Sequence, residues 1–182
     1  EECDIVGWSM GSAGGMSVAR KKQSLIRKLV LITPFSWLGG AVYSDKLAFK
    51  VFISFVRIRE RLFPNFNPRS KFSFLRKSQS IEDEYTEWAW NNLHRSKDDF
   101  IYGDGGRFVV PYDARPWIHE IHSETLVITG GKDKLVPEET SNEVINRLNT
   151  VKSKVINDAG HSVPWTHADE LLEEINSFLN NE

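Results

Sequence analysis

Four short apolar runs, alternating with helical patterns, constrain the fold of this chain more than any other feature of its sequence. The runs occupy residues 3–8, 28–33, 124–129 and 154–156. Strands that are apolar along their whole length are buried on both faces, and their alternation with helices is typical of a parallel sheet. The sequence therefore predicts an α/β fold, with a mostly parallel sheet and flanking helices.

The helical patterns between these runs place apolar residues on one face. One helix is expected from about Ser12, a second over residues 137–148 and a third over residues 167–179. The residues expected to face inward follow the helical period. They are Val144, Ile145 and Leu148 in the second helix, and Leu171, Leu172, Ile175, Phe178 and Leu179 in the third.

The segment between the second and third runs is different in character. It is rich in aromatic residues and proline, and helices are expected over residues 45–62 and from Ser80. We expect residues 37–118 to form a helical lid or cap insertion. Residues 1–36 and 119–182 would then be the two parts of the core that carries it.

Composition and charge exclude several classes of protein. The formal net charge of −2 gives no reason to expect nucleic acid binding, and no apolar run is long enough to span a membrane. The single cysteine, Cys3, lies in the first run and is expected to be a small buried hydrophobe, so a reducing compartment such as the cytoplasm is predicted. The histidines have no ligand-like spacing, so no metal is expected.

The segment Gly7-Trp8-Ser9-Met10-Gly11 joins the first strand to its helix and has the pattern of a nucleophile elbow. A serine at such a tight turn sits on a strained backbone, so Gly7 and Gly11 are both expected to be required for lack of space. The Met10 N–H is the expected first donor of an oxyanion hole, at the positive end of the helix dipole. The alternative is a glycine-rich turn with no catalytic role.

Two further polar residues follow the third and fourth runs. Asp133 lies in Gly130-Gly131-Lys132-Asp133, and His161 lies in Ala159-Gly160-His161. The carboxyl ends of parallel strands meet at one edge of a sheet, so Ser9, Asp133 and His161 are expected to meet there. Taken singly, Asp133 is typical of a turn residue or helix cap, and His161 of a surface loop residue. Asp158, next to the histidine loop, is the alternative to Asp133 as the acid.

These motifs, in the order Ser, Asp, His, make the chain resemble the carboxyl-terminal part of an α/β-hydrolase fold protein of the serine esterase type. The resemblance implies that Ser9 is the nucleophile, His161 the general base and Asp133 the residue that orients it, with no cofactor. It also implies a carboxylic ester or thioester substrate, cleaved through an acyl-enzyme. Lactones and carbon–carbon bonds stay open as alternatives.

Substrate contacts are expected from aromatic residues near the elbow. Trp8 and Trp37 are the predicted substrate-binding residues and would line an apolar acyl pocket, although core packing explains such aromatics equally well. The basic segment with Arg57, Arg59 and Arg61 could receive an acidic carrier protein, as in carrier-protein methyl ester esterases. A solvated helix face is the plainer explanation of that segment.

The chain departs from the resemblance at its front. The further strands that a full member carries before the elbow strand are missing, together with the loop that usually supplies the second oxyanion donor. The sequence shown also has neither an initiator methionine nor a signal peptide. We therefore hypothesise a fragment or truncated product of a longer hydrolase, with the second donor outside the chain. A non-catalytic binding or scaffold protein is the alternative function.

Overall fold

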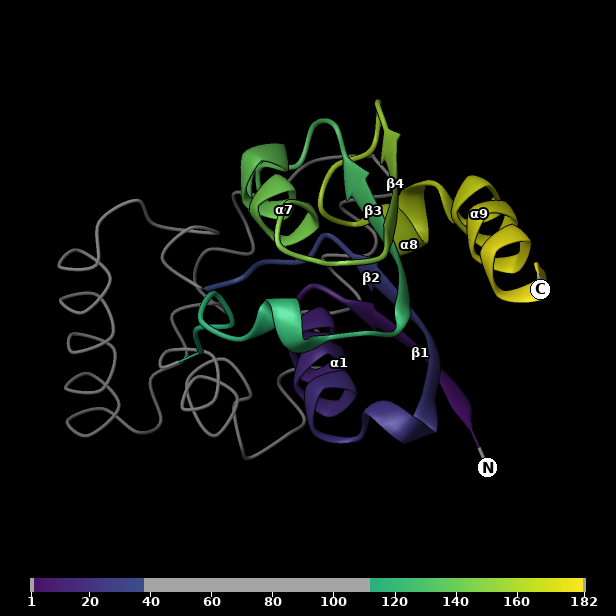
Figure 1. The fold of residues 1–182 in the computed structure, drawn as a ribbon. Coiled ribbons are helices and arrows are strands. Elements are labelled where there is room, and N and C mark those ends of the chain that lie inside the picture. Colours follow the sequence, from purple (N-terminus) through teal and green to yellow (C-terminus); the bar gives the residue numbers. More distant parts are fainter. Residues whose placement is uncertain (1, 38–111, 182) are drawn as a thin grey trace, which may run out of the picture. The chain divides into compact units, whose positions relative to one another are not determined.

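The computed structural model describes residues 2–37 and 112–181, and these form a parallel sheet with helices on both faces (Figure 1). The strands are β1 (Cys3–Trp8), β2 (Ile26–Ile32), β3 (Glu124–Gly130) and β4 (Val151–Ile156). Their order in the sheet is β1-β2-β3-β4, and every neighbouring pair is parallel. The expected fold class is confirmed.

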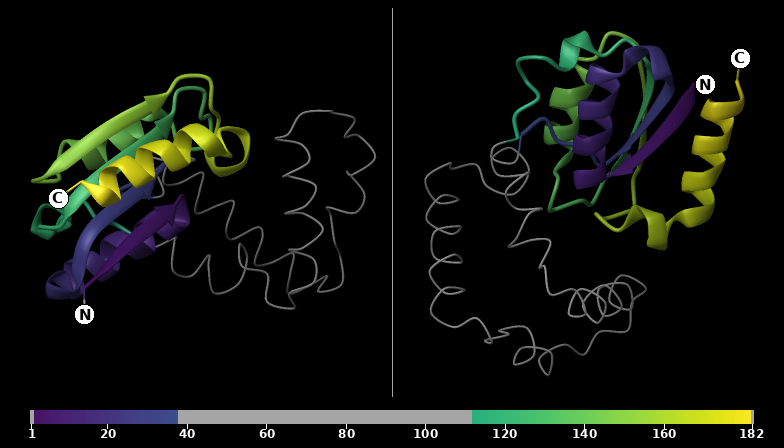
Figure 2. Two further views of the ribbon diagram at one scale, coloured as in Figure 1. Left: turned by 90° about the vertical axis from the view of Figure 1, so that its right-hand side faces the viewer. Right: turned by 90° about the horizontal axis from the view of Figure 1, so that it is seen from below.

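The helices cover the two faces of this sheet separately (Figure 2). The helices α1 (Met10–Lys21) and α7 (Glu138–Ile145) lie on one face, and α9 (Ala168–Asn180) lies on the other, preceded by the short helix α8 (Val163–Thr166). Two short 3₁₀ helices, η1 (Gln23–Leu25) and η3 (Ile118–Glu120), lead into β2 and toward β3. None of the helices in the described ranges is long and apolar enough to cross a membrane.

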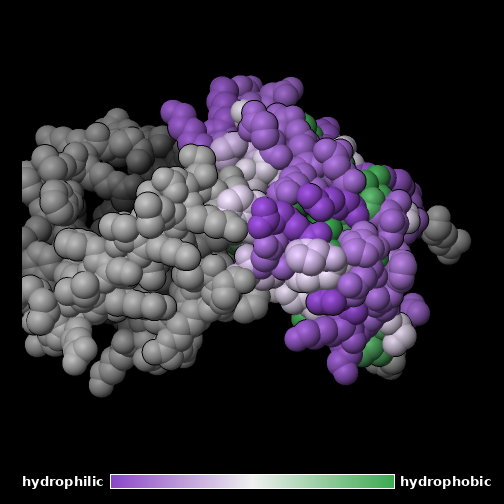
Figure 3. All heavy atoms as spheres, turned by 60° about the vertical axis from the view of Figure 1, so that its left-hand side comes forward, coloured by the Kyte–Doolittle hydropathy of each residue, from purple (hydrophilic) through white to green (hydrophobic). Residues whose placement is uncertain are grey.

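Each face of the sheet has its own hydrophobic core. Side chains of β2 alternate between the two cores, because successive residues of a strand point to opposite faces. Leu29 and Leu31 join the core under α1 and α7, whereas Val30 and Ile32 join the core under α8 and α9. The exposed surface seen in Figure 3 is mostly hydrophilic, with hydrophobic residues appearing as small separate patches.

Cys3 and Leu172 were both expected to be buried, and both are exposed. Cys3 is exposed rather than buried, because it opens β1, the edge strand of the described sheet. Leu172 is 53% exposed, whereas Leu171, Ile175 and Phe178 are buried as expected. One helical step of about 100° separates Leu172 from Leu171 and turns its side chain away from the sheet.

Lys28 anchors the end of α9 to the inner strand β2. Its side chain is buried, and its Nζ donates hydrogen bonds to the carbonyls of Phe178, at 2.9 Å, and Asn181. The ammonium also lies 5.3 Å from the centroid of the Phe178 ring. A cation at this position meets the negative end of the helix dipole.

The two ends of the predicted insertion meet in the described part of the chain. Trp37 forms an isolated antiparallel bridge with Asp113, and the Ala114 N–H donates to the Ser36 carbonyl at 2.7 Å. Arg115 pairs with Asp113 through two contacts of 2.8 and 2.6 Å. The predicted insertion helices lie outside the described residues, so the proposed lid and its boundaries stay a prediction.

Candidate active site

The elbow brings Ser9 to the carboxyl edge of the sheet on a strained backbone. Ser9 has φ 53° and ψ −116°, in the region that L-residues rarely adopt. Its N–H donates to the Ile32 carbonyl at 2.8 Å, which ties the serine to the end of β2. The helix α1 begins directly afterwards at Met10, earlier than the sequence pattern indicated.

The two glycines of the elbow differ in what they do. A Cβ atom on Gly7 would lie 2.6 Å from the Gly11 carbonyl oxygen, so a side chain is excluded there. A Cβ on Gly11 would have no atom of residues 2–37 and 112–181 within 4 Å, so this part of the chain does not produce the expected lack of space at Gly11. The reason is that Gly11 contributes its backbone, rather than its missing side chain, to the close approach.

Ser12 also shapes the elbow, and sequence reasoning missed it. Its buried hydroxyl lies 2.7 Å from the Gly7 carbonyl and 3.1 Å from the Ile32 carbonyl. It thereby links the ends of β1 and β2 on either side of Ser9. Ser12 follows Ser9 by three residues and lies in the first turn of the helix. This spacing could have indicated that its hydroxyl bonds to the backbone of the elbow.

Asp133 is held rigidly in the loop after β3. Its Oδ1 accepts hydrogen bonds from the N–H groups of Leu135 and Val136, both at 2.8 Å. Its Oδ2 lies 2.8 Å from the His161 Nδ1, and its side chain is fully buried. Both oxygens therefore have partners, which fixes the direction in which the carboxylate faces the imidazole.

His161 connects this carboxylate to the serine. Its Nε2 lies 3.0 Å from the Ser9 Oγ, and its side chain is 17% exposed. With the ring proton on Nδ1 donated to Asp133, Nε2 is free to accept the hydroxyl proton of Ser9. The structure thus brings the three predicted residues into one hydrogen-bonded chain.

Close backbone packing sets the distance between the loop that carries Asp133 and the loop that carries His161. A Cβ on Gly130 would lie 2.5 Å from the Gly160 carbonyl oxygen, and one on Gly131 would lie 2.7 Å from the Asn157 carbonyl oxygen. The Lys132 N–H donates to the Ala159 carbonyl at 2.9 Å. Glycine at these two positions therefore lets the aspartate loop lie directly on the histidine loop.

Asp158, the alternative acid, is engaged elsewhere. Its carboxylate lies 2.6 Å from the Lys132 Nζ at the surface, and that hydrogen bond lowers the pKa of Asp158. His161 instead contacts Asp133.

The other predicted site residues lie as follows. Met10, the expected oxyanion donor, is the first residue of α1, whose first N–H groups have no acceptor within the helix. The Trp8 indole Nε1 donates to the His161 carbonyl at 3.0 Å. Trp37 lies under the Arg115 guanidinium, whose Cζ is 4.3 Å from a ring centroid. Arg57, Arg59 and Arg61 are outside the described residues.

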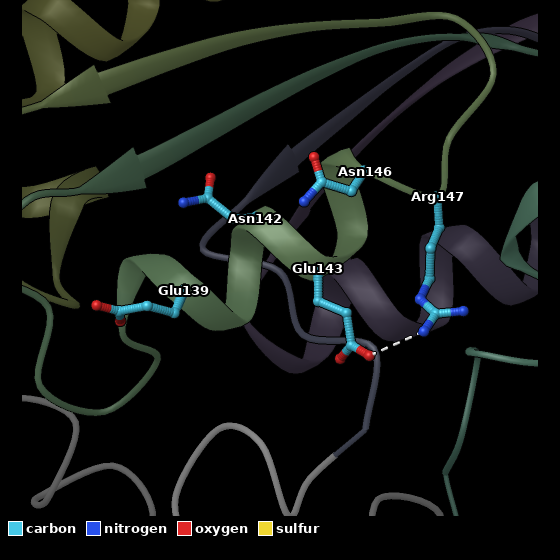
Figure 4. Close-up of a pocket in the computed structure, with 5 residues that line it drawn as sticks. All are labelled: Glu139, Asn142, Glu143, Asn146 and Arg147. Carbon is cyan, nitrogen blue, oxygen red and sulfur yellow. Dashed lines mark hydrogen bonds and ion pairs between the residues drawn. The ribbon is translucent and has the colours of Figure 1, made fainter.

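A surface hollow of about 540 Å³ lies beside α7 (Figure 4). It is separate from the hydrogen-bonded side chains of Ser9, His161 and Asp133. Its lining comes from α7 and the turn after it, and Glu143 and Arg147 form an ion pair there. It contains none of the predicted catalytic residues. Within residues 2–37 and 112–181, no group of three metal-ligating side chains is present.

Comparisons with known proteins agree with this fold. Residues 1–168 match the family model described as alpha/beta hydrolase fold. A hydrolase from Oleispira antarctica has a structure that aligns with a TM-score of 0.74 at 16% identity, over 100% of this chain and 66% of that one.

Two curated relatives are similar over 100% of this chain. One is the 2-hydroxy-6-oxo-6-phenylhexa-2,4-dienoate hydrolase of Burkholderia cepacia, at 27% identity. The other is the 2-hydroxy-6-oxononadienedioate/2-hydroxy-6-oxononatrienedioate hydrolase of Comamonas testosteroni, at 26% identity. The chain spans 64% of the length of each.

Proposed function

Because the chain belongs to the alpha/beta hydrolase fold family, we propose that it is a serine hydrolase that works through Ser9, His161 and Asp133. The observation that carries the proposal is the unbroken hydrogen-bonded chain between these side chains. Its two links measure 2.8 Å, from Asp133 Oδ2 to His161 Nδ1, and 3.0 Å, from His161 Nε2 to Ser9 Oγ. A nucleophile, a base and an orienting acid in contact are the parts that acyl transfer needs.

The geometry supports a two-step reaction. His161 takes the Ser9 proton as Oγ attacks the substrate carbonyl, and the buried Asp133 carboxylate stabilises the imidazolium that forms. The Met10 N–H, at the start of α1, would bind the oxygen on which negative charge develops. His161 then passes its proton to the leaving group, and water releases the acyl group from Ser9 by the reverse sequence.

The proposed substrate is a small carboxylic ester or thioester, as the sequence predicted, with an apolar acyl group. The names of the relatives favour a second candidate, a 6-oxo dienoate. The 6-oxo carbonyl of such a compound has carbon on both sides, so hydrolysis at that carbonyl must break a carbon–carbon bond. Both substrates present a carbonyl to the same nucleophile, and the described residues fit either.

A fluorophosphonate probe tests the nucleophile. We expect the folded chain to be labelled covalently, and Ser9→Ala to abolish labelling. Ser17→Ala is the matched control in the same helix, where the hydroxyl donates to the Ala13 carbonyl, and it should be labelled like the unchanged protein. A folded protein that the probe does not label would favour the alternative, a non-catalytic binding or scaffold role.

A substrate panel then separates the two chemistries. Acyl esters and thioesters of increasing chain length are compared with 2-hydroxy-6-oxo-6-phenylhexa-2,4-dienoate, whose consumption is followed by the loss of its absorbance. Turnover of the dienoate but not of the esters would replace the first candidate with the second. The cytoplasm remains the proposed location, supported by the single cysteine, whose thiol is free.

A further inference from the structure

The indole of Trp8 spans the gap between the nucleophile elbow and the histidine loop. Trp8 is the residue directly before Ser9, and its Nε1 donates to the backbone carbonyl of His161 at 3.0 Å. The two rings also approach each other, with centroids 5.4 Å apart and planes tilted by 38°. Trp8 therefore contacts both the main chain and the ring of the proposed general base.

A second aromatic contact holds the indole in this position. Trp165, in the helix that follows the histidine loop, packs edge-on against Trp8 with ring centroids 4.9 Å apart. Trp8 itself is half-buried and packs against the core under α8 and α9. The indole is thus fixed along its length, which directs its N–H at the carbonyl.

The histidine loop is held from two sides. On the acid side, backbone hydrogen bonds join it to the aspartate loop, among them the one from the Lys132 N–H to the Ala159 carbonyl at 2.9 Å. On the nucleophile side, the loop is bound through the Trp8 indole and through the His161–Ser9 contact itself. Acylation removes the Ser9 hydroxyl proton that is donated to His161. The hydrogen bond from the Trp8 indole does not use the Ser9 hydroxyl, so acylation leaves it in place.

We propose that Trp8 is a positioning residue for His161, which sets the distance between Nε2 and the Ser9 Oγ throughout the reaction cycle. This inference rests on the proposed function. Because Trp8 and Ser9 are consecutive, any displacement of the elbow carries the indole and the nucleophile together, and the histidine backbone follows. A phenyl ring fills much of the same space but has no donor, so the N–H is the group that does this work.

The test separates the N–H from the packing of the ring. Trp8→Phe removes the donor and part of the ring, and replacement of Trp8 by 3-benzothienylalanine removes the donor alone. We expect both to lower the maximal rate of fluorophosphonate labelling about 10- to 100-fold, with the half-saturating probe concentration little changed. The reason is that the base is displaced while the probe site is kept.

Trp117→Phe is the matched control. It also loses an indole from the same unit, but this partly buried ring packs against the core under α1 and α7, and the variant should label at the unchanged rate. Circular dichroism and thermal unfolding show that each variant is folded. A benzothienylalanine protein that labels at the unchanged rate would overturn the proposal, because the packing would then be sufficient.

A second measurement works even if Ser9 does not react. The proton between His161 Nδ1 and Asp133 gives a low-field NMR resonance that reports the geometry of this pair directly. We expect it to be sharp in the unchanged protein and in Trp117→Phe, and broadened or lost in both Trp8 variants. If labelling fails everywhere but this difference is seen, the proposed function is wrong and the positioning role stands. If labelling fails everywhere and the resonance is the same in every protein, the positioning role is wrong.

Discussion

Two residues at the carboxyl edge of the sheet have a positive φ without being glycine. One is Ser9, whose strain lifts the hydroxyl toward His161. The other is Thr33, directly after β2, with φ 46°. Thr33 is fully buried, and its Oγ1 has no hydrogen-bond partner in the described part of the chain. For a β-branched residue this backbone conformation is a true outlier.

Replacing Thr33 with glycine should stabilise the protein. Glycine adopts a positive φ without strain, and the substitution removes a buried hydroxyl that has no partner. We expect Thr33→Gly to raise the free energy of unfolding by about 1 kcal/mol, after the loss of a buried methyl group is subtracted. Urea unfolding followed by circular dichroism measures this.

Thr125→Gly is the matched control, because Thr125 is equally buried but lies in the extended strand β3. Its hydroxyl donates to the Ser123 carbonyl at 3.0 Å, so glycine there should be destabilising. If both variants lose stability to the same degree, Thr33 is not strained.

Asp133→Asn should uncouple the acid from the base while leaving the fold intact. The asparagine Oδ1 can still accept from the Leu135 and Val136 N–H groups, so its NH₂ would face His161 and impose the wrong tautomer. We expect kcat to fall on the order of 10⁴-fold, with thermal unfolding nearly unchanged. Asp158→Asn, which removes the surface pair with Lys132, should leave kcat close to its original value. An equal loss in both variants would exclude Asp133 as the acid.

At the scale of elements, sequence patterns located β1 and β3 to within one residue, but they began β2 two residues too late and β4 three residues too late. The strand β2 was recognised because nearly every residue in it is buried. The strand β4 begins at Val151, three residues before the predicted run, because it is an edge strand whose early residues Lys152 and Ser153 are exposed and polar. An apolar run identifies burial rather than strand pairing, so an exposed strand extends beyond its apolar part.

The buried Lys28 could not have been predicted, because its partners are carbonyls at the far end of the chain. Lys28→Met keeps the length of the side chain but removes the donor to Phe178 and Asn181. We expect the free energy of unfolding to fall by about 1–2 kcal/mol, with fraying of the last turn of α9. Hydrogen exchange measured residue by residue locates the loss.

Lys154→Met is the comparison for Lys28→Met. Lys154 pairs with Glu174 at 2.7 Å on the surface, where water screens the interaction, so a smaller effect is expected. A greater loss of stability in Lys154→Met than in Lys28→Met would contradict the anchoring role of Lys28.

For the molecule as a whole, the prediction of the active site rested mostly on the order in which three loops follow the strands of one sheet. Ser9, Asp133 and His161 were predicted to meet because each follows a parallel strand, and they are now seen within 3.0 Å of their neighbours. The contact from Trp8 to the His161 carbonyl was not predictable in the same way. It depends on the direction of one indole and on the path of a loop 153 residues away, which no local pattern encodes.

The pairing of Trp37 with Asp113 makes a prediction at this scale. Because the backbone is already joined there, a short Gly-Ser linker can replace residues 38–111 with little added loop-closure entropy. We expect the shortened chain to unfold cooperatively and to keep the low-field NMR resonance of the His161–Asp133 pair. Loss of that resonance would mean that the insertion is needed to shape the active site.

That same pairing has an evolutionary consequence. A segment that leaves and re-enters a framework at one pair of neighbouring residues can be lengthened, shortened or exchanged by recombination without altering the register of any strand. Changes in the length of residues 38–111 would therefore leave the pairing of β1, β2, β3 and β4 in place. The bridge from Trp37 to Asp113 is the place at which the predicted insertion would be exchanged.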